Sequence, residues 1–294
     1  MADGSHPHEL LAGISSRYPG DELLARLLEV DLVASDIDEC LFPGFSQSYL
    51  GHQIFFDIVT RPETVTDVRF VPQLVHGGAF IRKVSLLRRV GRPPGNAALM
   101  RRYEHSMWLI PRAYFLKGAQ RIPGRSFPGV AETLALLGRR VPVGLISFGI
   151  QLIADEYMRQ LNDAGPRPFV VFAEANPVTF VPGSDGRLAF AGYDPSPRTE
   201  PRHKREILEQ RLLAHRASRP LVIGNGRDEC EMAALAARRG GLSFGFQPEP
   251  QDARCFDVVI RTRDWVPLAD LLHQMLQHEP LQPDLQQPAA EGRP

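Results

Sequence analysis

The strongest constraint on the fold is a recurring alternation of short apolar runs with segments of helical periodicity. The runs expected to form strands occupy residues 31–35, 141–146, 169–172, 221–223, 242–246 and 258–260. The helical segments that alternate with them occupy residues 21–29, 130–137, 150–161, 204–213 and 229–238. Continuous apolar strands alternating with helices are typical of a parallel sheet that is buried on both faces. The pattern therefore predicts an α/β fold with a doubly wound, mostly parallel sheet.

One long segment, residues 45–125, interrupts this alternation. It contains 13 basic and 4 acidic residues, so it carries a net charge of +9 within a chain whose formal net charge is zero. Apolar clusters at residues 54–56 and 107–110 favour helices in this segment. We predict an inserted, basic, mainly helical cap domain. Its charge fits either a lid that attracts an anion or a solvated basic face.

The remaining boundaries follow from composition. Residues 1–20 are polar and rich in glycine, which predicts a flexible arm, and residues 277–294 are rich in proline and glutamine, which predicts a disordered tail. The α/β core is therefore expected at residues 21–44 and 126–276.

Charge and cysteine content exclude several classes of protein. A neutral chain is a poor general binder of nucleic acid, because phosphate contacts need a surplus of Lys and Arg. The longest mainly apolar run, residues 141–150, is too short to span a bilayer, and the first twenty residues do not resemble a signal peptide. The three cysteines, Cys40, Cys230 and Cys255, form no CxxC pair. We therefore expect a reducing, cytoplasmic location, no disulfide and no zinc site, with Cys40 and Cys230 as packing residues.

Two of the predicted strands end in residues that can carry chemistry, and in open α/β sheets ligands bind at the carboxyl ends of the strands. Asp36 and Asp38 follow the strand at residues 31–35. One could act as a nucleophile while the other moves a proton, or both could simply cap a helix. Ser147 closes the strand at residues 141–146 and could bind an anion at the start of the next helix, or serve only as its N-cap.

Two further features lie later in the chain. Lys204 stands in the first turn of a predicted helix, where a cation opposes the helix dipole, so it is placed there either for a ligand or as a solvated side chain. Residues 224–229 follow the strand at residues 221–223 and contain Asn225, Asp228 and Glu229. Small residues with oxygen ligands at a strand end suit Mg2+.

Taken in this order, the four features resemble the motifs of the haloacid dehalogenase (HAD) superfamily. The matches are Asp36 with Asp38, then Ser147, then Lys204, then residues 224–229. Residues 127–130 (FPGV) and the expected hairpin at residues 178–190 are similar to the phosphoserine-phosphatase-like branch. The resemblance covers about residues 30 to 275. It implies a Rossmann-like sheet with a cap inserted between the first and second motifs.

The resemblance also implies a mechanism. Asp36 would attack phosphorus and form an aspartyl phosphate, and Asp38 would protonate the leaving oxygen and then activate water. Ser147 and Lys204 would hold the phosphoryl oxygens. Mg2+ would lie between Asp36, the backbone carbonyl of Asp38 and the loop that contains Asn225, Asp228 and Glu229. The presence of Asp38 argues against a dehalogenase, because the dehalogenases of this superfamily lack that second acid.

The sequence departs from the family pattern at three positions. Asn225 stands where the family has a metal-binding Asp, so one charge is lost, and Asp228 or Glu229 would compensate. Glu39 and Cys40 also replace the usual residues of the first motif. The sequence thus predicts a Mg2+-dependent phosphatase that acts on a small, anionic phosphate ester. The alternatives are a phosphotransferase and a non-catalytic phospholigand-binding protein on the same fold; the sequence leaves the oligomeric state open.

Overall fold

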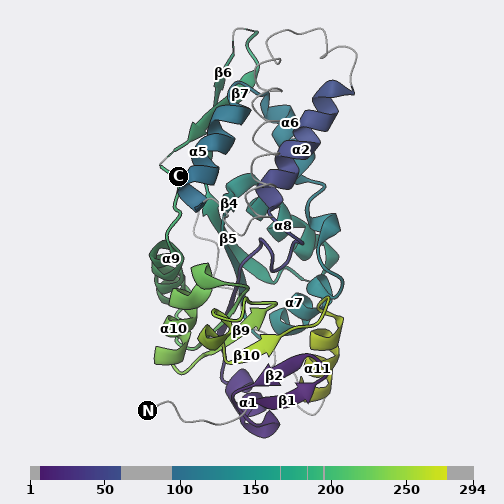
Figure 1. The fold of residues 1–294 in the computed structure, drawn as a ribbon, viewed down its shortest axis with the longest axis vertical. Coiled ribbons are helices and arrows are strands. Elements are labelled where there is room, and N and C mark those ends of the chain that lie inside the picture. The colour runs from purple at the N-terminus through teal and green to yellow at the C-terminus, as the bar shows by residue number, and fades with distance from the viewer. Residues whose placement is uncertain (1–6, 61–94, 166, 184, 195, 277–294) are drawn as a thin grey trace.

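The computed structural model describes the chain apart from residues 1–6, 61–94, 166, 184, 195 and 277–294. An eight-stranded sheet flanked by helices forms the larger part of the molecule, and a smaller layer of helices with a two-stranded hairpin lies at one end (Figure 1). The α/β fold predicted from the alternating apolar runs is confirmed. None of the helices in the described ranges is long and apolar enough to cross a membrane.

The large sheet is parallel except at one edge. Its six strands from β10 to β5 pair in parallel, while β1 pairs with β2 and β2 pairs with β10 in antiparallel fashion. In spatial order the strands are β1 (His8–Leu11), β2 (Ile14–Ser16), β10 (Val258–Ile260), β9 (Leu242–Phe246), β8 (Pro220–Gly224), β3 (Leu32–Ser35), β4 (Val143–Ile150) and β5 (Val170–Asn176).

Strand β3 lies inside the sheet, and its alternating side chains enter two separate hydrophobic cores. Leu32 and Ala34 belong to the core formed with α9 (Pro201–Ala214) and α10 (Cys230–Arg238). Val33, on the opposite face, belongs to the core that also contains the helices α1 (Gly20–Leu28), α7 (Val130–Gly138), α8 (Gln151–Ala164) and α11 (Val266–Leu276). Burial on both faces explains why this strand is apolar at successive positions.

The turn before α7 shows why glycine stands in the FPGV segment. Gly129 has φ +84°, and a Cβ there would lie 2.5 Å from the backbone nitrogen of Val266. The Trp265 amide donates to the carbonyl of Pro128 at 2.9 Å, so this turn is in direct contact with the start of α11.

The N-terminal prediction is partly wrong. Residues 8–16, expected in a flexible arm, form β1 and β2 and extend the sheet beyond β10. The expected tail at residues 277–294 lies outside the described residues, as does much of the proposed cap.

The described part of the cap is helical, as expected. It consists of α2 (Ser46–Val59), α5 (Asn96–Met107) and α6 (Arg112–Ala119), which lead through the short helix η2 (Pro123–Arg125) back to the core. The hairpin of β6 (Val178–Pro182) and β7 (Leu188–Tyr193) belongs to the segment predicted as core, yet it packs on these helices (Figure 1). The ring of Phe115 lies 5.1 Å from that of Phe190 and 5.4 Å from that of Phe180.

Asn176, at the end of β5, holds the two ends of the hairpin segment together. Its side chain is 1% exposed. The amide Nδ2 donates to the Phe148 carbonyl at 2.8 Å and to the Arg198 carbonyl at 3.1 Å, while Oδ1 accepts the Arg198 amide at 2.6 Å. The chain therefore leaves the core at Asn176 and returns to the same point at Arg198.

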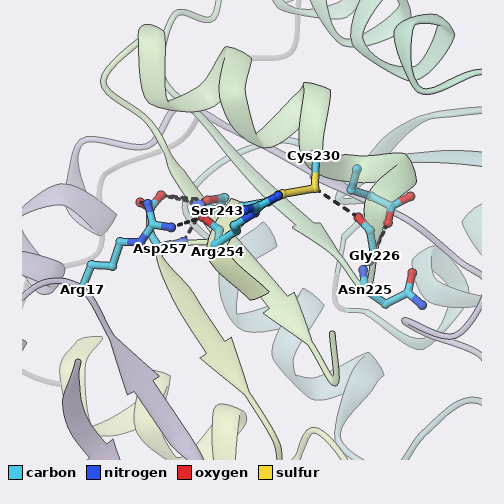
Figure 2. Close-up of a disulfide and its surroundings, with 9 residues drawn as sticks. Arg17, Asn225, Gly226, Cys230, Ser243, Arg254 and Asp257 are labelled. Atoms are coloured by element: carbon cyan, nitrogen blue, oxygen red, sulfur yellow. Dashed lines mark hydrogen bonds and ion pairs between the residues drawn. A yellow bond between two sulfur atoms is a disulfide. The ribbon is translucent and has the colours of Figure 1, made fainter. Parts of the chain in front are cut away.

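The expectation that the cysteines form no disulfide is wrong. Cys230, at the start of α10, is bonded to Cys255 at the end of the short helix η4 (Ala253–Cys255), 25 residues later in the sequence. Figure 2 shows that this bond lies close to Asn225 and Gly226. Cys230 is therefore a bridging residue, and the argument for a reducing compartment loses its basis. Cys40 is buried and free, which confirms its interpretation as a packing residue.

We expect the disulfide to contribute about 3 to 4 kcal/mol to the free energy of unfolding, the amount that follows from closing a loop of this length in the unfolded chain. Reduction, or the double substitution Cys230→Ala/Cys255→Ala, should lower the urea midpoint by the corresponding amount. The reductant should not shift the midpoint of the double variant. Thiol labelling of the unfolded, unreduced protein should detect one cysteine; detection of three would contradict the bridge.

Candidate active site

The carboxyl end of β3 positions the two acids of the first motif. The Asp36 amide continues the hydrogen bonding of β3 to β8 by donating to the Ile223 carbonyl at 2.9 Å, and the residue is 4% exposed. Asp38 lies two residues further, where its Oδ1 accepts the backbone N–H of Ser46 at 2.8 Å. Ser46 is the first residue of α2, so Asp38 is held at the N-terminus of the first cap helix.

Lys204 lies between two buried carboxylates. Its Nζ donates to Asp36 Oδ1 at 2.8 Å and to Glu229 Oε1 at 2.5 Å, and its side chain is 2% exposed. Nζ also lies 4.7 Å from the centroid of the Phe148 ring. The pairing with Asp36 and Glu229, which follow two different strands, therefore explains why a lysine stands in the first turn of α9.

Burial governs the charge states of these groups. Burial alone would lower the pKa of Lys204, but the carboxylates of Asp36 and Glu229 raise it above its ordinary value, so the ammonium stays charged. Burial raises the pKa of Asp36 well above the ordinary range, and Lys204 opposes this shift. Burial also raises the pKa of Asp38, against the hydrogen bond from Ser46. A raised pKa suits a carboxyl group that has to deliver a proton.

Ser147 differs from its predicted place. Strand β4 continues to Ile150 and α8 begins at Gln151, so Ser147 is not the cap of that helix. Its Oγ is buried and accepts the Gly149 amide at 2.9 Å. A Cβ on Gly149 would lie 3.2 Å from Ser147 Oγ and 3.9 Å from Asp38 Oδ2, so both side chains approach the same glycine.

The loop after β8 provides one residue that binds Lys204 and others that face the site. Glu229, at the end of η3 (Arg227–Glu229), is 1% exposed. Its Oε1 accepts from Lys204, while Oε2 accepts the amides of Asn225 at 3.3 Å and Gly226 at 3.1 Å. Both oxygens of Glu229 are thus engaged by the protein.

Asn225 turns toward the first motif. Its Nδ2 donates to Glu39 Oε2 at 3.4 Å. Glu39 has φ +57°, a left-handed backbone conformation that residues other than glycine, Asn and Asp rarely adopt. This conformation carries its carboxylate across to the loop after β8, a contact that the sequence analysis did not foresee.

These residues face one cavity of about 540 Å³ between the core and the cap. Asp36, Asp38, Lys204, Asn225, Asp228 and Glu229 all line it, so the structure brings together six of the seven predicted site residues. Ser147 is not among the lining residues. Glu249 and Asp252, in the loop after β9, also line the cavity and were missed. The rule that parallel strands end at one edge would have pointed to this loop.

The predicted basic lid is not what the described residues form. The cap residues that line the cavity, none of them basic, are Phe45, Gln47, Ser48, Leu99, Met100 and Tyr103. Lys117 and Arg121 instead pair with Asp57 at 3.0 and 3.4 Å. Arg101 and Arg102 do not line the cavity, and Arg88 and Arg89, the other candidates for a lid, lie outside the described residues.

The donor set around Asp36 fits a hard cation. Carboxylate oxygens from Asp36 and Asp228, the amide oxygen of Asn225 and the backbone carbonyl of Asp38 are the types of ligand that Mg2+ takes. Among the residues that the structure describes, no three or more His, Cys, Asp or Glu side chains are already gathered in the manner of a metal centre. The chemistry of these donors therefore fits a divalent cation.

Removal of the central ammonium should be costly. Lys204→Met leaves Asp36 and Glu229 as unpaired buried acids, so we expect a loss of about 3 to 5 kcal/mol in the free energy of unfolding. The matched control is Arg202→Met on the same helix. Arg202 and its partner Glu200 are both 57% exposed, so that change should cost less than about 1 kcal/mol. Urea denaturation measures both, and equal losses would contradict the role given to Lys204.

Comparison with known proteins supports the architecture. No family model and no curated protein matches the sequence. Among solved structures, an apo phosphoserine phosphatase matches with a TM-score of 0.55 at 17% identity, over 85% of this chain and 98% of that chain.

Two further structures match in the same way. Cytosolic 5'-nucleotidase IIIB bound to cytidine matches with a TM-score of 0.58 at 18% identity, over 91% of this chain and 95% of that one. A HAD family hydrolase from Salmonella enterica serovar Typhi matches with a TM-score of 0.57 at 14% identity, over 82% and 71%. These likenesses confirm the expected fold: the chain has the architecture of the HAD hydrolases, in the form seen in phosphoserine phosphatases.

Proposed function

We propose that this protein is a Mg2+-dependent phosphatase that hydrolyses a small-molecule phosphomonoester through an aspartyl phosphate on Asp36. One observation carries the proposal: two carboxyl groups, Asp36 and Asp38, directly follow the same buried strand and face one cavity, with Lys204 2.8 Å from Asp36. The fold shared with phosphoserine phosphatases supports it.

In the first step, a carboxylate oxygen of Asp36 attacks phosphorus while the bond between phosphorus and the ester oxygen breaks. The carboxyl group of Asp38, whose raised pKa favours the protonated form, gives its proton to the departing oxygen, so the leaving group departs as a neutral alcohol. Burial raises the pKa of Asp36, and the ammonium of Lys204 opposes that shift, which favours the charged, nucleophilic form.

In the second step, Asp38 takes a proton from a water molecule, whose oxygen attacks phosphorus. The bond between Asp36 and phosphorus then breaks and inorganic phosphate leaves. Lys204 would stabilise the phosphoryl oxygens in both steps, and the Ser147 hydroxyl, which like the Asp38 carboxyl group approaches Gly149, would assist through a hydrogen bond.

A bound Mg2+ would supply positive charge that offsets the repulsion between the Asp36 carboxylate and the phosphate. Asp36, the Asp38 carbonyl, Asn225 and Asp228 would hold it. Glu229 would act as a positioning residue, because its two oxygens already bind Lys204 and the backbone of the loop.

The phosphatase proposal predicts release of phosphate from an aryl phosphate in the presence of Mg2+. Asp36→Asn should remove nearly all activity without unfolding the protein, because an amide is a far weaker nucleophile of almost equal size. Asp38→Asn should slow turnover by about 10²- to 10⁴-fold. Asp163→Asn, in an exposed pair on α8, is the matched control and should retain full activity.

Three outcomes separate the alternatives. Tight binding of the phosphate ester with no phosphate release by the unmodified protein would favour the binding protein. Transfer of the phosphoryl group to an added alcohol would favour the phosphotransferase. Retention of more than about a tenth of the rate by Asp36→Asn would contradict the nucleophile assignment.

The metal proposal predicts opposite effects of Asn225→Asp with and without Mg2+. Without the cation, the new carboxylate faces Glu39, which Asn225 contacts at 3.4 Å, so the melting temperature should fall. With the cation, the added charge should lower the Mg2+ concentration needed for half-maximal activity and for half-maximal thermal stabilisation. An unchanged Mg2+ requirement would place Asn225 outside the metal shell.

A further inference from the structure

Two of the positions at which the chain departs from the family pattern are in direct contact. Glu39 belongs to the first motif, after β3, and Asn225 directly follows β8, so the two lie 186 residues apart in the sequence. Both residues line the cavity that Asp36 also lines. Asn225 Nδ2 lies 3.4 Å from Glu39 Oε2. The two departures therefore form one feature of the site.

The two ends of the Asn225 side chain differ in what they can bind. An amide has a carbonyl oxygen that accepts and an NH2 group that only donates, so only its oxygen can bind a divalent cation. An amide that nothing orients can turn either end toward the cavity. A carboxylate has two equivalent oxygens, so an Asp at this position would need no orientation.

Glu39 selects between the two orientations of the amide. An ionised carboxylate accepts hydrogen bonds and donates none, so it attracts Nδ2 of Asn225 and repels Oδ1. The contact with Nδ2 therefore leaves Oδ1 as the end of the amide that can bind a cation. The backbone amide of Asn225 is held separately, by Glu229 Oε2 at 3.3 Å. Two carboxylates thus fix the main chain and the side chain of Asn225.

The backbone conformation of Glu39 supports a specific role for its side chain. Its φ of +57° lies in the left-handed region, which glycine adopts far more readily than glutamate. The residue is exposed, and its amide donates to the Gly44 carbonyl at 3.0 Å, a bond that glycine would make equally well. Neither burial nor the turn explains a glutamate here, whereas strained conformations are retained at functional sites.

We propose that Glu39 is a positioning residue, which orients the amide of Asn225 so that Oδ1 is presented to Mg2+. This inference rests on the proposed Mg2+-dependent function and assigns to it a residue outside the set of metal ligands. The charge that Asn225 lacks is then supplied beside the ligand instead of on it. Loss of a residue that orients a metal ligand typically weakens metal binding by about 10- to 100-fold.

A double-mutant cycle separates orientation from charge. Glu39→Ala should raise the Mg2+ dissociation constant about tenfold, because Asn225 loses the group that orients it. In the Asn225→Asp background the same change should raise the constant less than about threefold, because a carboxylate needs no orientation. Calorimetric titration with Mg2+, in the absence of substrate, measures the unmodified protein and the three variants. Equal losses in both backgrounds would show an effect of charge alone and would overturn the proposal.

The matched control is Glu249→Ala. Glu249 is another exposed acid that lines the same cavity, from the loop after β9. Removal of its charge should change the Mg2+ dissociation constant by the same factor in the unmodified and in the Asn225→Asp background. If Glu249→Ala depends on the residue at position 225 as strongly as Glu39→Ala does, the specific role of Glu39 is refuted.

The contact itself is tested without the cation. Asn225→Asp places two carboxylates side by side, so it should lower the melting temperature when Glu39 is present and not in the Glu39→Ala background. An equal fall in both backgrounds would contradict the contact. If Glu39→Ala does not fold, Glu39→Gly takes its place in every measurement, because glycine adopts this φ without strain.

Metal binding separates this inference from the proposed function. The expected pattern of affinities in a protein that releases no phosphate would uphold the role of Glu39 and refute the phosphatase. Release of phosphate, together with equal losses of affinity in both backgrounds, would refute the role of Glu39 alone. An unmodified protein that binds no Mg2+ would refute both the role of Glu39 and the Mg2+ dependence of the proposed function.

Discussion

The buried ammonium of Lys204 is the interaction on which the rest of the site depends. It joins the end of β3 through Asp36 and the loop after β8 through Glu229, while its own backbone belongs to α9. Glu229 in turn fixes the amides of Asn225 and Gly226. Three segments that are distant in the sequence are thereby held in one geometry, and each charge is tolerated in the interior because the others are present.

The core was predictable because burial on both faces leaves a strong signal. Residues 32–35, 221–223 and 242–246 are apolar runs, and the acids that follow β3 could be placed at one sheet edge by topology alone. Strands β1 and β2, which extend the sheet beyond β10, carry no such signal, since His8 and Glu9 are exposed and two serines follow Ile14. The disulfide was missed because Cys230 and Cys255 meet only through the packing of α10 against η4.

The cap shows the limit of reasoning from charge. A count of basic residues predicts the electrostatic field around a segment, but it does not predict where each side chain points. Lys117 and Arg121 are drawn to Asp57, and the guanidinium groups of Arg112 and Arg125 lie over the rings of Phe180 and Tyr49. Folding thus directs these cations to partners on the cap itself. Tyr103 is distinguished by its burial and Glu39 by its backbone conformation, and no sequence motif indicates either property.

The hairpin attaches the cap to the core at a second point. The polypeptide enters the cap region first between β3 and α2, and again where β5 passes into β6. The second point is clamped by Asn176, which joins the start and the end of the hairpin segment. A domain anchored at one place can swivel in any direction, whereas one anchored at two can rotate only about the line between them. We therefore expect any opening of the cap for substrate entry to be a rotation about this line, with the three helices and the hairpin moving together.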